Sequence, residues 1–240
     1  MLASILVVLA SLVLVTSRQN LPHAVAGPAA ESVVSQIESR VGKAGWEKLE
    51  AVSFYFVPGG RAHFKDFRRN FVEVQFAMDS SQFLVQYDSD GRFVIYKNRQ
   101  RIQGQVAEQV LVQAQKFHTA DFFLLNPFVQ LRGAGVEHKI TEEGDLLVLF
   151  PSGPMDGDSY VIRTDATGMP LQWKVWSGSS RLKGLKFQFE NWRELSPGVR
   201  TSLMHTSFFK NVEIRDVRGF TAYPGPENKD RFTELAEMKK

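Results

Sequence analysis

The sequence predicts a mainly β fold with a few helices (α+β) and antiparallel strands, on three observations. Apolar and polar residues alternate over many short segments, which is the period of half-buried strands. Asp165-Ala166-Thr167-Gly168 suits a type I turn followed by a left-handed residue, and it joins the two alternating arms of a hairpin from Gly157 to Trp176. Phenylalanine accounts for 19 of the 240 residues, which favours a wide apolar interior.

Composition excludes several classes of protein. The 29 Lys and Arg residues against 26 Asp and Glu residues give a net charge of only +3, which argues against a nucleic-acid partner. The absence of cysteine excludes disulfides, thiolate chemistry, Cys-based metal sites and a lipid-modified N-terminal cysteine. A chain of this length can form one β domain.

The N-terminus carries an apolar run from Leu2 to Val15, too short for a comfortable membrane span and typical of a secretory signal. Ala24-Val25-Ala26 offers the small residues that signal peptidase requires, although no Lys or Arg precedes the run. We therefore expect residues 1–26 to be a signal peptide or a retained membrane anchor, 27–240 to form a single domain, and the protein to be exported to the periplasm or cell envelope. A buried N-terminal helix or strand is the alternative.

The first half of the domain is predicted to combine helices with four antiparallel strands. An amphipathic helix begins near Ala29 and is interrupted at Gly42 and Gly45. The predicted strands are Val52–Phe56, Val72–Phe76, Phe83–Tyr87 and Arg92–Tyr96. A helical insertion follows from Gly104 to Phe128, which either fills the core or acts as a movable lid over an apolar cavity.

The second half is predicted to be β-rich, with the hairpin from Gly157 to Trp176 and a short C-terminal helix at Arg231–Met238. Its other strands are Val136–Ile140, Leu146–Phe150, Gly184–Trp192, Arg200–Phe209 and Val212–Phe220.

No residue pattern points to catalysis. The five histidines show no close pair and no metal-ligand spacing, and no nucleophile elbow or phosphate-binding loop occurs. We therefore predict a non-enzymatic protein with no catalytic residue, metal or cofactor. An enzyme on this fold would need a polar cluster inside the hollow of the sheet, and we identify none in the sequence.

The segment from Arg61 to Phe71 is the most basic and most aromatic part of the chain. It either meets anionic lipid headgroups at a membrane surface or forms a strand with a solvated basic face.

This order of elements resembles the periplasmic lipoprotein-carrier, or lipoprotein-sorting, family (LolA/LolB-like) from about Ala29 to Phe220. The local phrases that carry the resemblance are Trp46 with Leu49, Leu124-Leu125-Asn126-Pro127-Phe128, Asp158-Ser159-Tyr160 with Trp173, and Phe189-Glu190-Asn191-Trp192 with Gly198-Val199-Arg200. The resemblance implies a curved, half-open antiparallel β-barrel, with inserted helices covering a concave face that binds acyl chains.

On this basis we predict a lipid- or lipoprotein-binding protein that carries acylated ligands between envelope membranes. The alternative is an envelope interaction module with a filled core and a protein partner. The expected headgroup-binding residues are Arg61 and Arg163. The expected cavity-lining residues are Phe54, Phe56, Val74, Phe76, Phe83, Val85, Phe117, Phe122, Phe123, Leu171, Trp173, Phe187 and Phe189.

Overall fold

The computed structural model describes residues 19–150, 157–178, 183–225 and 228–238. Its strands hydrogen-bond in the order β1-β8-β9-β10-β11-β12-β13-β14-β2-β3-β4-β5-β6-β7. The strand pairs with a described register are antiparallel, and among the described strands β1 and β7 stand at the two ends of the order. The predicted fold class, an open antiparallel sheet with inserted helices, is confirmed.

The helices are α2 (Pro28–Val41), α3 (Lys43–Trp46), α4 (Gln105–Leu125) and α5 (Thr233–Glu237), with 3₁₀ turns η1 (Val57–Gly59) and η2 (Pro127–Gln130). The first strands are β1 (Ala24–Val25), β2 (Ala51–Phe56), β3 (Arg61–Asp66), β4 (Phe71–Met78), β5 (Ser81–Tyr87), β6 (Phe93–Lys97) and β7 (Gln100–Ile102). The later strands are β8 (Glu137–Thr141), β9 (Leu146–Phe150), β10 (Asp158–Thr164), β11 (Pro170–Trp176), β12 (Lys183–Ser196), β13 (Val199–Thr206) and β14 (Val212–Phe220).

The chain divides into two compact units, and each is described by itself. Unit 1 contains the chain up to Val41 together with Phe128–Asn191 and His205–Asn211. Unit 2 contains Gly42–Pro127, Trp192–Met204 and the chain from Val212 onward.

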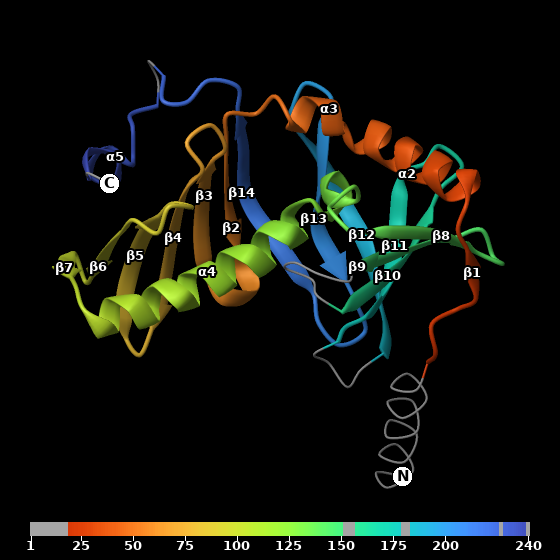
Figure 1. Cartoon of the computed structure of the whole chain (residues 1–240), viewed down its shortest axis with the longest axis horizontal. Coiled ribbons are helices and arrows are strands. Elements are labelled where there is room, and N and C mark those ends of the chain that lie inside the picture. The colour runs from red at the N-terminus through yellow and green to blue at the C-terminus, as the bar shows by residue number, and fades with distance from the viewer. Residues whose placement is uncertain (1–18, 151–156, 179–182, 226–227, 239–240) are drawn as a thin grey trace, which may run out of the picture. The chain divides into compact units, whose positions relative to one another are not determined.

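In unit 2, helix α4 covers one face of the sheet. The register pairs Val74 of β4 with Val85 of β5, so alternate residues of both strands point to the same side. The helix buries residues spaced three or four apart, including Ala107, Val110 and Ala114, and these pack in one core cluster with Val74 and Val85. Figure 1 shows α4 lying across β4 and β5.

The opposite face of this sheet is covered by the C-terminal segment. Tyr223, Phe232 and Leu235 are buried in a cluster with residues that include Phe64 and Phe71. The sheet of unit 2 is therefore apolar on both faces, as sheets covered on both sides are.

Two arginines of the basic segment in β3 and its following turn, Arg61 and Arg69, form ion pairs with carboxylates. Arg69 donates from Nε to Asp66 and from Nη1 to Asp230, both at 2.6 Å. Its side chain therefore ties the C-terminal segment to this turn.

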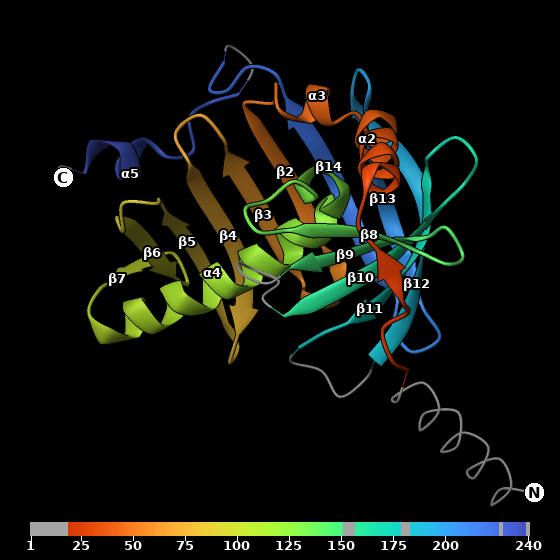
Figure 2. The same ribbon diagram turned by 45° about the vertical axis from the view of Figure 1, so that its right-hand side comes forward.

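Unit 1 contains the predicted hairpin, formed by β10 and β11. Asp165 Oδ1 accepts the backbone N–H groups of Thr167 at 2.8 Å and Met169 at 2.9 Å, and Gly168 has a φ of 84°. The turn chemistry predicted from the sequence is therefore confirmed. Helix α2 contacts β8 and β9 in the same unit, as Figure 2 illustrates.

Several boundaries differ from the prediction. The first half of the domain has two strands that we did not predict, β3 and β7. Strand β13 ends at Thr206, so the predicted strand end at Phe208 and Phe209 was wrong; both residues lie in the turn before β14.

The expected signal or anchor falls largely outside the described residues. Its last part is described, and there β1 pairs Ala24 with Thr141 of β8. The backbone carbonyl of Gln19 accepts a hydrogen bond from Trp176 Nε1 at 2.8 Å. Cleavage after Ala26 would remove both contacts; cleavage and retention remain open predictions.

Candidate functional site

A buried polar cluster lies between α4 and β3 in unit 2. Asp121 of α4 accepts Arg61 Nε at 2.6 Å on Oδ2 and Arg61 Nη2 at 2.9 Å on Oδ1. Its Oδ2 also lies 2.9 Å from His63 Nε2, and His63 Nδ1 lies 3.4 Å from His118 Nδ1. The side chains of His63 and Asp121 are 0% and 3% exposed, so the ion pair is shielded from water.

The hydrogen-bond pattern fixes the tautomers of the two neutral histidines. A carboxylate only accepts, so His63 must donate from Nε2 to Asp121. Its Nδ1 is then an acceptor, and His118 must donate from Nδ1. With both histidines neutral, each contact in the series from Arg61 through Asp121 and His63 to His118 therefore pairs a donor with an acceptor.

Aromatic rings enclose this polar chain. The Arg61 guanidinium lies 4.3 Å from the ring centroid of Phe117 and 5.1 Å from that of Phe56. Phe54 stacks on His63 with centroids 4.6 Å apart, and Phe122 stacks on His118 at 5.2 Å. Rings exclude water while favouring the cation through their quadrupoles.

Burial keeps both imidazoles neutral. It is the largest cause that lowers the pKa of His63, against the opposing effect of the hydrogen bond to Asp121. Burial also holds the pKa of His118 well below its ordinary value; the charge of Lys65 adds to this effect, and a proton on His63 would do so as well. Protonating His63 would place a second cation on Asp121, the same carboxylate that already holds Arg61.

The nine predicted cavity-lining residues of unit 2 lie on β2, β4, β5 and α4. Six come from β2, β4 and β5 and are at most 5% exposed: Phe54, Phe56, Val74, Phe76, Phe83 and Val85. From α4, Phe123 is buried, Phe117 meets Phe76 edge-on at 5.3 Å, and Phe122 lies 6.5 Å from Phe54. In this structure α4 therefore packs against the face that we expected to line a cavity.

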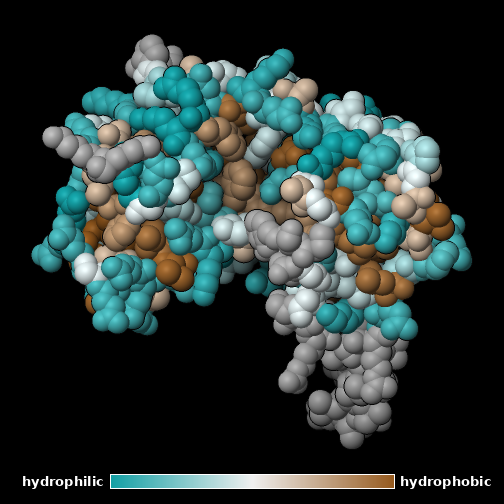
Figure 3. Space-filling view, viewed as in Figure 1, coloured by the Kyte–Doolittle hydropathy of each residue, from teal (hydrophilic) through white to brown (hydrophobic). Residues whose placement is uncertain are grey.

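Helix α4 is also apolar on part of its solvent side. Val106 and Val112 are 56% and 50% exposed, and Figure 3 shows hydrophobic residues reaching the surface in this region. The helix therefore exposes apolar surface on the side that faces away from the sheet.

The predicted lining residues of unit 1 divide into two groups. Trp173 and Phe189 are buried with ring centroids 5.0 Å apart, and Phe128 and Tyr160 lie within 5 Å of one or the other. Phe187 is half-buried, and Leu171 is 46% exposed. Only the first group belongs to this aromatic cluster.

The two predicted headgroup-binding arginines are both engaged by carboxylates. Arg61 is held by Asp121, and a headgroup could reach it only after that ion pair opens. Arg163 of β10 pairs with Asp145 at 2.8 Å on the surface of unit 1. Headgroup binding by either residue stays a prediction.

Sequence reasoning missed the polar cluster: we identified none in the sequence, and the structure forms one between α4 and β3. His118 and Asp121 lie in the buried stripe of α4. Arg61 and His63 are two positions apart in β3 and therefore face the same side of the sheet. Two polar residues three apart in an otherwise apolar helical stripe were the available signal.

Neither a metal site nor a membrane-spanning helix is found where the structure is described. In the described residues, no group of three or more His, Cys, Asp or Glu side chains is arranged to hold a metal ion. Across those same residues, no helix is both long enough and apolar enough to span a bilayer.

The sequence matches no family model and no curated protein. One solved structure is similar, a domain described as an outer membrane lipoprotein-sorting protein from Vibrio parahaemolyticus. It shares 13% identity over 79% of this chain and 93% of that domain, with a TM-score of 0.39.

Proposed function

We propose that this protein binds an acyl chain of a lipid or lipoprotein on the sheet face beneath α4 and carries it within the cell envelope. The observation that supports the proposal is the way α4 is attached. One helix covers the apolar face of the unit 2 sheet, and a buried ion pair holds it near its C-terminal end.

The covered strip has suitable dimensions. The 21 residues of α4 span about 31 Å at 1.5 Å per residue. That equals the hydrocarbon thickness of a bilayer, ~30 Å, which two acyl chains fill end to end. A single chain would therefore fit beneath part of the helix, and each methylene removed from water would contribute about 0.8 kcal/mol.

The buried polar cluster makes α4 a separable cover. A buried ion pair contributes little net stability, because the cost of desolvating both charges offsets their attraction. Once α4 lifts, Arg61 and Asp121 regain water, while the exposed faces of β4 and β5 require an apolar ligand. Arg61 would then be available to a ligand's anionic headgroup.

A specific observation favours the alternative, an interaction module with a filled core. Phe76 meets both Phe83 and Phe117 at ring distances of 5.4 Å and 5.3 Å, so the central part of α4 is closely packed on the sheet. In that case the protein would take up no acyl chain, and its outer surface would bind a protein.

Uptake of a fluorescent fatty acid by the purified full chain tests the proposal, with hydrogen exchange of residues 105–125 measured in parallel. Val85→Thr places a hydroxyl on the covered face, whereas Val112→Thr changes an exposed position of α4. We expect Val85→Thr to weaken binding several-fold and Val112→Thr to leave it unchanged. Absence of uptake, and of any lipid in native mass spectrometry of the protein from its own membranes, would leave the interaction module.

A further inference from the structure

We propose that the turn between β13 and β14 docks on an anionic lipid bilayer, with Phe208 and Phe209 inserted among the headgroups. Phe208 is 74% exposed and Phe209 is 45% exposed, and both belong to unit 1. Among the described residues, no other aromatic side chain stands among the exposed large hydrophobic residues. Adjacent exposed phenyl rings mark an interaction site more strongly than scattered apolar residues do.

The turn is ordered by its own hydrogen bonds. Ser207 Oγ accepts the Lys210 backbone N–H at 2.9 Å and donates to the Lys210 carbonyl at 2.5 Å. Asn211 Oδ1 accepts the Ser207 N–H at 3.4 Å. The two rings contact each other edge-on, with centroids 5.1 Å apart. A turn closed in this way keeps both rings at its tip.

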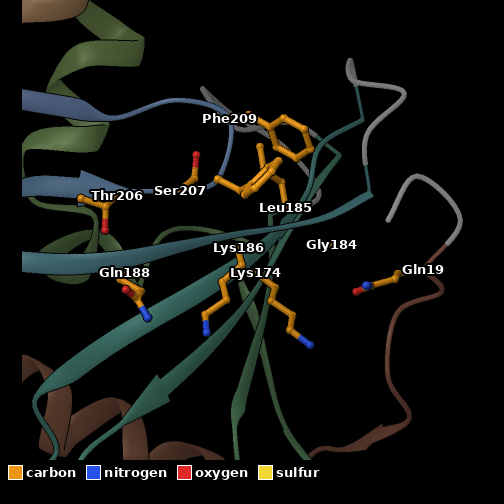
Figure 4. A pocket seen from close by; sticks show the side chains of 10 residues that line it. Gln19, Lys174, Gly184, Leu185, Lys186, Gln188, Thr206, Ser207 and Phe209 are labelled. Atoms are coloured by element: carbon orange, nitrogen blue, oxygen red, sulfur yellow. The ribbon is translucent and has the colours of Figure 1, made fainter. Parts of the chain in front are cut away.

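One basic residue belongs to the turn, and two more line the same cavity as its phenyl rings. Lys210 belongs to it, and the register places Lys174 of β11 directly opposite Lys186 of β12. Both strand lysines line a cavity of about 540 Å³ with Phe208 and Phe209. Figure 4 shows the Lys174 and Lys186 side chains extending together on one side of β12, with Leu185 and Phe209 on the other.

The charges favour an anionic partner. Like charges directly opposite each other across strands are destabilising. Within the described part of the chain, Lys174, Lys186 and Lys210 form no ion pair with an acidic side chain. Anionic headgroups would neutralise them, and long lysine side chains reach the headgroups while apolar neighbours insert more deeply.

A bilayer fits this edge better than a protein does. A stable protein interface takes about 800 Å² from each partner, whereas the apolar surface here is two phenyl rings and part of Leu185. A second copy of the chain would bring its own lysines against these, which costs electrostatic energy.

The absence of cysteine permits a direct test on the full chain. An environment-sensitive dye is attached at Phe209→Cys or, as the control, at Ala166→Cys on the exposed β10–β11 turn of the same unit. With phosphatidylglycerol-containing vesicles we expect a blue shift at position 209, quenching by lipid-borne quenchers, and no change at position 166. Pure phosphatidylcholine vesicles should give a much weaker response, and added salt should reduce the anionic one.

Vesicle sedimentation of unlabelled protein gives the second measurement. We expect Phe208→Ser with Phe209→Ser to lower the partition coefficient about tenfold or more, and Leu171→Ser, another exposed apolar residue of unit 1, to leave it unchanged. Every variant keeps the run from Leu2 to Val15, so any membrane affinity of that run is common to all.

Three results would overturn the proposal: equal dye responses at positions 209 and 166, unchanged partitioning of the double serine variant, or a dye shift that rises with protein concentration without vesicles. The last would indicate self-association. Because acyl-chain uptake is measured without vesicles, failure of that function and failure of membrane docking are distinguishable.

Discussion

Replacing Asp121 by Asn should loosen α4 strongly. The substitution keeps the size of the side chain and removes the carboxylate that pairs with Arg61, whose side chain is 15% exposed. Breaking a buried ion pair by removing one partner costs about 3–5 kcal/mol, because the other charge stays buried. Since 1.4 kcal/mol is a factor of ten, the population with α4 displaced should rise by roughly 10² to 4 × 10³ if this cost falls on the helix alone.

Urea unfolding and hydrogen exchange of residues 105–125 measure this effect. The matched control is Asp145→Asn, which breaks the surface pair with Arg163, whose side chain is 49% exposed, and should cost at most about 1 kcal/mol. Replacing both Arg61 and Asp121 by apolar residues of similar size should recover most of the stability. If Asp121→Asn costs less than about 1 kcal/mol, or if the double replacement is as unstable as the single one, the buried ion pair does not hold α4 in the way described.

Two further predictions concern pH and packing. Burial lowers the pKa of His63 and His118, so the unfolded chain binds more protons below pH 6.5 and stability falls as the pH drops. The slope should reach up to about 1.4 kcal/mol per pH unit for each histidine, and His118→Gln should flatten it in urea midpoints between about pH 5 and 7. Trp173→Ala should cost about 3–5 kcal/mol, whereas Leu171→Ala on the same strand should change stability by less than about 0.5 kcal/mol; equal losses would contradict the burial assignment.

The sequence by itself determined the fold class and most element positions. Alternation identified strands such as Val72–Phe76, because the side-chain period of a strand is local. The turn at Asp165 was equally predictable, since its hydrogen bonds join residues within four positions of one another. The long helix was recognisable from the spacing of apolar residues such as Val110 and Ala114, which the structure buries.

Other features depended on the tertiary structure. Arg61 and Asp121 are 60 positions apart, and only the packing of α4 on β3 brings them to 2.6 Å. Their contact turned a basic strand residue, expected to be solvated or to meet headgroups, into half of a buried ion pair. Phe208 continued an alternating strand in the sequence, yet its strand ends at Thr206 and its ring is exposed. Local pattern specifies where a side chain can point; what it meets depends on which distant elements pack there.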